Sequence, residues 1–410
     1  MPSIQIFSDS AFLRGSVTRS AVVAAIAGAA AASDFQVIDL GTLGGALSSA
    51  TALNESGDVA GVSTVIVGEA LHAFRWSGGT MIDLGALPNH PQSSAFAINA
   101  AGDVVGLSYS LGELDEAAVI WRGAGAVDSI GAFTARSIND LGIVVGVARP
   151  ISNAIAGMGA VRWENGASQM LGTLGGDASA AHAINDVGWI VGQSEPQAAR
   201  PPHAFVWING AMHDLGTLGG DYSVANDVNG AGQVVGVARR ADGVMHAFRF
   251  EVSASGVVTQ RTDLGDLGGQ YSAAYGINRQ GLVVGTSFDR AFLYQGGVMT
   301  NLNDRIPAGS GWVLTRATAI NDRMQIVGEG RHNGSVRAFL LNPPPALAGD
   351  MNCDGFVTVG DVGGFVLALT DPAGYAAQYP ACDIQNADMN QDGFITVGDI
   401  GLFVLALTGE

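Results

Sequence analysis

Two acidic loops near the C-terminus carry the clearest chemistry in this chain. They are the twelve-residue segments 350–361 and 388–399, and the second repeats the first 38 residues later. Oxygen-bearing side chains alternate along each loop, and a glycine at position 6 permits a sharp turn, which is typical of a calcium-binding loop. The expected ligands of the first loop are Asp350, Asn352, Asp354, the carbonyl of Phe356, Thr358 (directly or through water) and Asp361. Those of the second are Asp388, Asn390, Asp392, the carbonyl of Phe394, Thr396 and Asp399.

These ligands suit a hard cation, because Ca²⁺ takes six to eight oxygens. Aspartate stands at position 12, where the common EF-hand has the longer glutamate, so each site keeps three carboxylates. The last 61 residues hold nine Asp and Glu and no Arg. Two complete copies argue against a chance match or a merely solvated acidic turn. The sequence therefore predicts two Ca²⁺ ions and indicates no other cofactor.

Each loop runs into an apolar segment, 362–369 and 400–407, and both contain FVLALT. We expect two short helices that pack against each other. The chain has two cysteines, Cys353 and Cys382. In an exported protein they can pair, and closing a loop of about 30 residues would contribute roughly 3 to 4 kcal/mol. Two unpaired buried thiols are the alternative, whereas the spacing excludes a CxxC redox or zinc motif.

A duplicated calcium loop and helix, about 60 residues in all, resembles a type I dockerin. The resemblance implies an anchor that docks on a cohesin-like partner or a cell-surface scaffold protein. One departure concerns loop positions 10 and 11, where such dockerins carry hydroxyl-bearing or otherwise distinctive residues. Here they are Val359-Gly360 and Val397-Gly398. Calcium binding is thus better supported than cohesin binding.

Internal repeats organise the chain before this module. The phrase Asn-x-x-Gly-x-Val-Val-Gly recurs at intervals of 40 to 49 residues, which is the length of a four-stranded propeller blade. Its seven copies begin at Asn54, Asn99, Asn139, Asn185, Asn229, Asn278 and Asn321. A second phrase, HAFRW or a variant of it, follows each copy, and a third, of the form DLGTLGG, also occurs seven times if degenerate copies near Ile130 and Leu302 are included.

Each unit divides into four strand-like pieces, which in the fourth unit are 181–185, 189–194, 203–207 and 212–215. A type I turn followed by a glycine at positive φ explains the glycine three residues after each asparagine. Met324 replaces that glycine in the last unit, so we expect an altered turn there. Alanine-rich first pieces suit the crowded innermost strand, and the rings of the HAFRW piece suit the wider space further out.

The phasing of the repeats predicts how the ring closes. The seventh unit ends at Leu341 without a fourth strand, while an orphan strand, Gln36–Leu40, precedes the first unit. We therefore predict a mainly β fold, a seven-bladed β-propeller over 33–342 in which Gln36–Leu40 pairs with Arg337–Leu341. A β-solenoid, the competing architecture, would not call for an orphan strand. A Pro-rich linker, 343–349, and a small α-helical calcium domain, 350–410, follow.

The repeat phrases resemble the extracellular HAF-repeat family over about residues 35–342. That resemblance implies an extracellular location but no particular chemistry. Copies depart near Ile130 and at the insertion Asp304–Trp312, where a blade could be irregular.

The N-terminus and the charge limit the location and the partners. Arg14 and Arg19 precede an apolar run of 12 residues, 21–32, that ends in three alanines before Ser33. This pattern predicts a signal peptide, 1–32, and a secreted or cell-surface protein, with an alanine-rich helix as the alternative. No later segment is long and apolar enough to span a membrane. The formal net charge is −18 and the chain contains no lysine. Nucleic acid and anionic membranes are therefore not expected partners.

Other polar residues recur in the repeats. His72, His203 and His246 share one repeat position. We interpret them as strand-end histidines with local hydrogen bonds, because equivalent positions in a ring lie far apart and cannot share a metal ion. Asp177 and Asp221 lie in loops that are expected to be turns between blades. The alternative for these two is a rim that binds cations or sugars.

The sequence favours a noncatalytic function. It contains no GxSxG, HExxH, phosphate-loop or dinucleotide motif. We expect a secreted calcium-binding surface or scaffold-associated protein, with the propeller as a ligand-binding or structural module and the dockerin-like module as an anchor. The alternative is a glycoside hydrolase acting on polysaccharide within an extracellular complex. Facing carboxylates in an axial pocket would favour that alternative, and catalytic residues remain unassigned.

Overall fold

The structure is a computed structural model that describes residues 35–66, 70–110, 116–123, 126–148, 157–197, 200–344, 347–353, 357–379 and 382–408. The predicted signal peptide, 1–32, lies outside the described residues, as do Asp354 and Phe356 of the first acidic loop. The chain divides into two compact units, one of which is Asp34–Pro345 while the other contains Ala346–Glu410. Each unit is described by itself.

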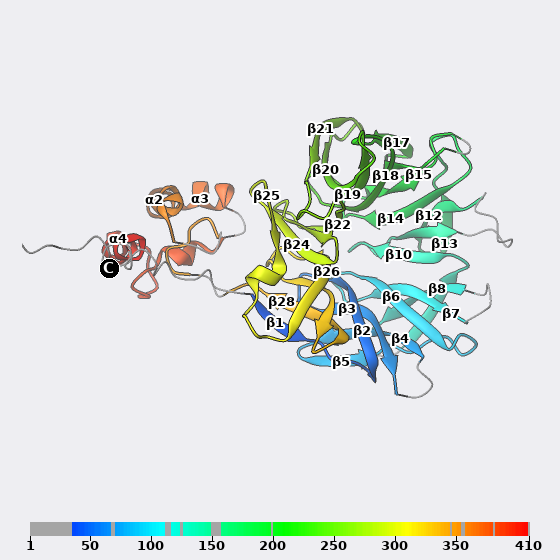
Figure 1. The fold of residues 1–410 in the computed structure, drawn as a ribbon, viewed down its shortest axis with the longest axis horizontal. Coiled ribbons are helices and arrows are strands. Elements are labelled where there is room, and N and C mark those ends of the chain that lie inside the picture. Colours follow the sequence, from blue (N-terminus) through cyan, green and yellow to red (C-terminus); the bar gives the residue numbers. More distant parts are fainter. Residues whose placement is uncertain are drawn as a thin grey trace, which may run out of the picture. The chain divides into compact units, whose positions relative to one another are not determined.

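The first unit is a seven-bladed β-propeller of four-stranded antiparallel sheets (Figure 1), as predicted. Blade 1 consists of β2 (Gly44–Leu53), β3 (Val59–Val65), β4 (Leu71–Ser77) and β5 (Thr80–Asp83). Blade 2 consists of β6 (Gln92–Ile98), β7 (Val104–Tyr109), β8 (Glu116–Arg122) and β9 (Ala126–Gly131). Blade 3 consists of β10 (Thr134–Ile138), β11 (Val144–Ala148), β12 (Gly159–Glu164) and β13 (Ala167–Met170). Blade 4 consists of β14 (Ser179–Ile184), β15 (Ile190–Ser194), β16 (His203–Ile208) and β17 (Ala211–Gly216).

The remaining blades follow the same order. Blade 5 consists of β18 (Gly219–Val228), β19 (Gln233–Arg240), β20 (Met245–Val252) and β21 (Val258–Asp263). Blade 6 consists of β22 (Ala273–Ile277), β23 (Val283–Ser287), β24 (Arg290–Gln295) and β25 (Val298–Asn301). Blade 7 is β26 (Trp312–Ile320), β27 (Ile326–His332), β28 (Ser335–Asn342) and β1 (Gln36–Asp39). The departures near Ile130 and at 304–312 leave every blade four-stranded, and a short 3₁₀ helix, Leu302–Arg305, precedes β26.

The N-terminal strand closes the ring. β1 pairs antiparallel with β28, from Gln36 opposite Asn342 to Asp39 opposite Phe339. The N–H of Leu40 extends the ladder with a bond to the carbonyl of Ala338. The predicted closure is thereby confirmed, and it protects a strand edge that would otherwise be open for pairing with another chain.

The recurring asparagine and glycine form the hairpin between the first two strands of each blade. In blade 3, the N–H of Gly142 donates to the carbonyl of Asn139 at 3.0 Å, and Gly142 has φ +77°. The altered turn expected at Met324 does not occur. Met324 makes the same bond, to Asn321 at 3.1 Å, and adopts φ +57° itself. The rest of the hairpin thus holds a non-glycine residue in a left-handed conformation that it rarely adopts.

Side-chain size increases from the axis outward, as predicted. The innermost strands present fully buried alanines, and the phenylalanines of the third strands fill the space between the sheets. These residues are Ala50, Ala95, Ala135, Ala181, Ala225, Ala274 and Ala317 on the inner strands, and Phe74, Phe205, Phe248, Phe292 and Phe339 on the third strands. Trp121 and Phe250 lie still further along the third strands and are also buried.

A serine from the following blade joins the HAF and DLG phrases. The hydroxyl of Ser223 accepts the N–H of Ala204 at 2.8 Å and donates to the carbonyl of Gly216 at 2.5 Å. The same pair of bonds is made by Ser48, Ser93, Ser179 and Ser272. The two phrases therefore recur because each holds one blade against the next.

The C-terminal unit is a small helical region. Its elements are the 3₁₀ helices η2 (Val359–Asp361), η3 (Ile384–Ala387) and η4 (Val397–Asp399) and the α-helices α2 (Val362–Thr370), α3 (Pro372–Gln378) and α4 (Ile400–Thr408). The two predicted helices are present, and α3 was not predicted. The rings of Phe365 and Phe403 stack at 3.9 Å, which packs α2 against α4. Among the described residues, no helix is both long and apolar enough to span a membrane.

Candidate functional site

A closed ring of asparagine side chains surrounds the propeller axis at one face. Each of the seven repeat asparagines is buried and donates its side-chain amide to the main-chain carbonyl of the asparagine in the next blade, at 2.9 to 3.3 Å. The amide oxygen of the same residue accepts the N–H four residues on, as Asn139 does from Ile143 at 2.9 Å. Each asparagine thus shapes its own hairpin and also holds the neighbouring blade.

A second ring lies directly beside the first, at the residue after each asparagine. These residues are Glu55, Ala100, Asp140, Asp186, Gly230, Arg279 and Asp322. Where this residue is acidic, its carboxylate accepts the N–H of the equivalent residue in the preceding blade. Asp140 accepts from Ala100 at 2.8 Å and Asp186 accepts from Asp140 at 2.9 Å. The hairpins thereby bring charged side chains together at the axis.

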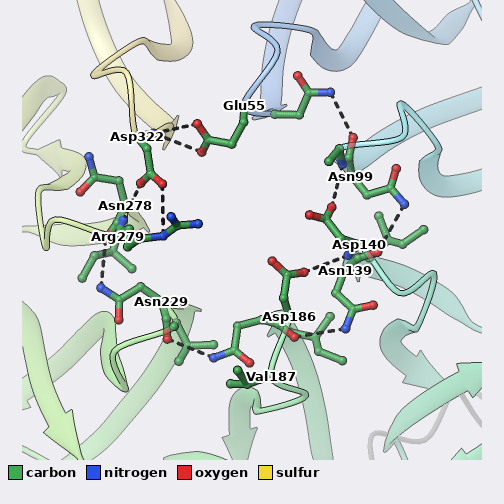
Figure 2. Close-up of a pocket in the computed structure, with 18 of the residues that line it drawn as sticks. Glu55, Asn99, Asn139, Asp140, Asp186, Val187, Asn229, Asn278, Arg279 and Asp322 are labelled. Carbon is green, nitrogen blue, oxygen red and sulfur yellow. Dashed lines mark hydrogen bonds and ion pairs between the residues drawn. The ribbon is translucent and has the colours of Figure 1, made fainter. Parts of the chain in front are cut away.

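These rings enclose a pocket of about 400 Å³ (Figure 2). Aliphatic side chains that precede the asparagines also line it, and each is 5 to 7% exposed: Ile98, Ile138, Ile184, Val228, Ile277 and Ile320. The pocket therefore combines an aliphatic lining with a charged one.

The charged lining is mainly acidic. Four carboxylates, of Glu55, Asp140, Asp186 and Asp322, face one guanidinium, that of Arg279. Burial raises the pKa of Glu55, and the Asp322 charge adds to this, while the hydrogen bond from the Asp322 N–H opposes it. Arg279 Nε lies 3.4 Å from Asp322 Oδ2. With its carboxylates ionised, the pocket lining carries a charge of −3 and attracts cations.

Every inner strand contains a β-bulge, and the bulged residue is polar in six of the seven blades. The bulged residues are Thr51, Phe96, Arg136, His182, Asn226, Tyr275 and Thr318. Bulges re-aim side chains. Nδ1 of His182 lies 3.0 Å from the carbonyl of Ala225 in the next blade, and Nδ2 of Asn226 lies 2.7 Å from that of Ala274.

The bulged His182 and Asp227, which follows the bulged Asn226, have pKa values shifted in opposite directions. Burial lowers the pKa of His182 to about 4, with a further contribution from the Arg136 charge. Burial raises the pKa of Asp227 to about 6, although the N–H groups of Ile277 and Val228 donate to it. His182 is therefore neutral at pH 7, whereas Asp227 is ionised at an energetic cost.

The recurring histidines pair with aspartates of the outermost strands. His72 lies 2.9 Å from Asp83, and His203 lies 2.9 Å from Asp214. His246 contacts two carboxylates, Asp263 at 2.7 Å and Asp266 at 3.3 Å. The local hydrogen bonding expected for these histidines is thus present. A further histidine–aspartate pair that the sequence did not reveal joins His332, on the second strand of blade 7, to Asp39 at 2.8 Å and spans the ring closure.

Asp177 lies in the loop before β14, as expected, whereas the turn expected at Asp221 is wrong because this residue belongs to strand β18; both aspartates have local partners. The N–H of Asp177 donates to the Glu195 carboxylate at 3.1 Å, and Asp221 forms an ion pair with Arg239 at 2.7 Å. Both aspartates are exposed.

The second acidic loop is folded around its own oxygen atoms. Asp388 accepts the N–H groups of Asp392 and Gly393, at 3.1 and 2.8 Å, and Asn390 also accepts that of Asp392. The buried Asp399 accepts the N–H groups of Met389, Asn390 and Thr396. Phe394 and Thr396 lie between these residues, and the Phe394 ring is 71% exposed.

The described part of the first loop repeats this arrangement. Asp361 is buried and accepts the N–H groups of Met351, Asn352 and Thr358, at 2.8, 3.1 and 2.8 Å. Asp350, at position 1, is also buried. The oxygen-only donor set of both loops suits Ca²⁺. Over the described ranges, no three acidic, histidine or cysteine side chains are grouped as metal ligands. Asp354, the third carboxylate of the first loop, lies outside those ranges.

The two cysteines form a disulfide that ties the first loop to the segment before the second. Cys353, at loop position 4, has φ +54°, and Gln391 at the same position of the second loop has φ +57°. The duplicated loops also expose apolar side chains at equivalent positions. Val359 and Val397 are 85% and 80% exposed, and Val362 and Ile400 are also exposed.

The comparisons with known proteins identify no family. No family model matches the chain, and no curated protein matches it. Among solved structures, TolB from Acinetobacter baumannii is similar at TM-score 0.42 and 13% identity, over 70% of this chain and 63% of that one. The β-propeller domain of the Trilobed protease from Pyrococcus furiosus is similar at TM-score 0.45 and 12% identity, over 63% and 83%. A gluconolactonase from Xanthomonas campestris is similar at 0.40 and 12%, over 77% and 92%. The chain thus spans less than two thirds of the TolB structure.

Proposed function

We propose that this chain is a secreted calcium-binding protein in which a propeller that resembles the HAF-repeat family serves as a ligand-binding or structural module and a dockerin-like C-terminal module serves as an anchor. One observation carries the calcium proposal. In both loops a buried aspartate at position 12 accepts the N–H groups of positions 2, 3 and 9, so the two loops share one internal geometry. Such duplication is expected if each loop is built around the same ion.

The residues that would hold the ions are the predicted ones. Asp388, Asn390, Asp392, Thr396 and Asp399 supply side-chain oxygens in the second loop, and Phe394 supplies its carbonyl. The first loop supplies the equivalent atoms. Bound Ca²⁺ would offset two of the three negative charges of each loop and so hold the module in its folded form.

Anchoring is supported by the apolar surface of the same module. Val359 and Val397, at the loop positions through which type I dockerins read their partner, are almost fully exposed. An apolar surface of this kind suits a cohesin-like or cell-surface scaffold protein whose contact surface is also apolar. Such a partner would differ from those that read hydroxyl groups at these positions.

Calcium titration of the full chain tests the proposal. The wild type should bind two equivalents, and Asp350→Ala with Asp388→Ala should bind none while the propeller keeps its own melting transition. Because Asp350 is buried, Asp392→Asn provides a milder variant that should lose one equivalent only. Asp128→Asn, an exposed aspartate of the propeller, is the matched control. Undiminished calcium binding in the double variant would refute the site.

A second candidate function is hydrolysis of a polysaccharide. The axial pocket contains carboxylates, as that function requires, and Glu55 has a raised pKa, as a general acid does. Release of nitrophenol from aryl glycosides, with Glu55→Gln as the inactive variant, tests it. Equal rates for the variant and the wild type would exclude a catalytic role for this pocket.

A further inference from the structure

The axial pocket has two chemically different linings and an uneven distribution of charge. Aliphatic side chains from six blades form one lining, and the residues after the asparagines form the other. Figure 2 shows Asp140 and Asp186 together on one side of the pocket and Arg279 with Asp322 on the other. Ala100 and Gly230 occupy the same ring without charge. A ligand therefore meets a carboxylate pair, not a uniform acidic ring.

The carboxylates differ in how far their hydrogen bonds are satisfied. Asp322 accepts the N–H of Arg279 through Oδ1 and pairs with its guanidinium through Oδ2. Both oxygens of Glu55 contact the N–H of Asp322. Asp140 and Asp186 each accept one N–H through Oδ1. Within the described part of the chain, no donor contacts Oδ2 of either residue.

The role of these aspartates in joining the blades does not explain the second oxygen. An asparagine would accept the same N–H through its single Oδ1 without adding charge. Both aspartates are exposed, so a ligand can reach the second oxygen of each, and their two negative charges favour a bound cation. The aliphatic lining beside them would be of no use to a hydrated metal ion, but it can contact an alkyl group.

We propose that this pocket binds a small organic ammonium ion, whose N–H groups donate to Oδ2 of Asp140 and Asp186 while its alkyl part contacts the aliphatic lining. This inference rests on the proposed ligand-binding role of the propeller and names the ligand class. An ammonium group can donate to both carboxylates at once, and charge-assisted hydrogen bonds of this kind are the stronger ones. The charge of −3 on the lining disfavours carboxylate and phosphate ligands. Ca²⁺ is a poor fit because this pair offers few of the six to eight oxygens that it takes.

Binding of n-hexylammonium chloride to the full chain tests the proposal, with n-hexanol and sodium hexanoate as probes of equal length. Titration is followed by calorimetry, first without added calcium and then with equimolar CaCl₂. Hexylammonium should bind, and the neutral and anionic probes should bind at least tenfold more weakly. Asp140→Asn with Asp186→Asn should weaken hexylammonium binding at least tenfold, because asparagine keeps the acceptor for the blade contact and removes only the charge. Asp128→Asn should leave binding unchanged.

Three outcomes would overturn the proposal: no hexylammonium binding to the wild type, equal binding by the double variant, or displacement of hexylammonium by equimolar CaCl₂. The melting transition of the double variant shows whether it is folded, and the single variant Asp186→Asn repeats the test if it is not. Calcium binding by the C-terminal loops is read from the same protein by a separate titration. If hexylammonium fails to bind while the C-terminal loops still bind calcium, this inference is wrong and the calcium proposal is unaffected.

Discussion

The side-chain amide of Asn321 donates to the main-chain carbonyl of Asn54 at 3.2 Å, which joins the last blade to the first across 267 residues of sequence. This bond completes a ring in which every blade is tied to both neighbours. Together with the pairing of β1 and β28, it closes the propeller at two places, one beside the axis and one at the outer edge.

Removal of one ring asparagine should destabilise the propeller strongly. Asn139→Ala loses a donor to the Asn185 carbonyl and an acceptor for the N–H groups of Leu141 and Ile143. Buried groups left without partners cost about 1 to 3 kcal/mol each, so we expect a loss of about 3 kcal/mol in chemical denaturation. Asn139→Asp keeps the acceptor and should still lose stability, because its carboxylate faces a carbonyl. Asn165→Asp, at an exposed turn, should change stability by less than about 0.5 kcal/mol.

The repeat made most of the propeller predictable. Seven asparagines at intervals of 40 to 49 residues, six of them followed three residues later by glycine, and one orphan strand at Gln36–Leu40 determine the number of blades and the way the ring closes. The four-stranded division of each unit follows from local alternation and turns. The physical reason is that all seven units form the same local structure. A strand or turn that is ambiguous in one copy of the repeat can therefore be predicted from the other six.

The axial pocket was not predicted, because its residues are the ones that vary between copies. Glu55, Asp140 and Arg279 occupy an unspecified position of the repeat phrase, and only the ring brings them together. Alignment of the seven copies would have shown four acidic residues in that column. The bulged residues His182 and Asn226 were missed for a different reason, since a bulge depends on strand pairing and leaves no signature in a single strand.

Glycine at the third position after the asparagine should be worth about 1 kcal/mol in the hairpins. Gly142 has φ +77° and open space where a Cβ would lie, so Gly142→Ala costs only backbone strain. We expect a loss of about 1 kcal/mol. Gly230 lies two residues before the turn glycine Gly232. It is not at positive φ, and the space where its Cβ would lie is also open. Gly230→Ala should therefore be neutral, and an equal loss for both variants in urea unfolding would contradict the explanation.

The disulfide should favour calcium binding at the first loop more than at the second. It joins Cys353 of the first loop to Cys382, and the amide of the nearby Asn386 donates to the carbonyl of Asp350 at 2.9 Å. Cys353→Ser with Cys382→Ser removes the cross-link that restricts the first loop before calcium binds. Part of the free energy of calcium binding is then used to order this loop. In an Asp392→Asn background, which isolates the first site, we expect calcium affinity to fall about tenfold. In an Asp361→Asn background, the second site should change less, and equal losses at both sites would argue against a local role.

His182 and Asp227 should give the propeller opposite and nearly cancelling dependences on pH. The folded pKa of His182, about 4, lies below its unfolded value of 6.5, so the unfolded chain binds more protons between these values and stability rises with pH there. The folded pKa of Asp227, about 6, lies above its unfolded value of 3.8, so the folded chain binds more protons and stability falls as pH rises. Each slope is at most about 1.4 kcal/mol per pH unit, and the wild type should be nearly flat from pH 4 to 6 with respect to these two groups.

Single variants should reveal the two slopes. Asp227→Ser introduces a serine, which blade 3 already has at the equivalent position as Ser137. The Ser137 hydroxyl accepts the N–H of Ile184 in the next blade. Relative to the wild type, this variant should gain stability as pH rises from 4 to 6, because only the histidine still titrates. His182→Thr introduces the residue found at Thr51, which makes the same inter-blade bond, and should lose stability over the same range. Urea unfolding at pH 4.5 and 6 measures both differences. Parallel pH profiles for the wild type and both variants would show that neither group titrates as its half-buried position on the inner strands requires.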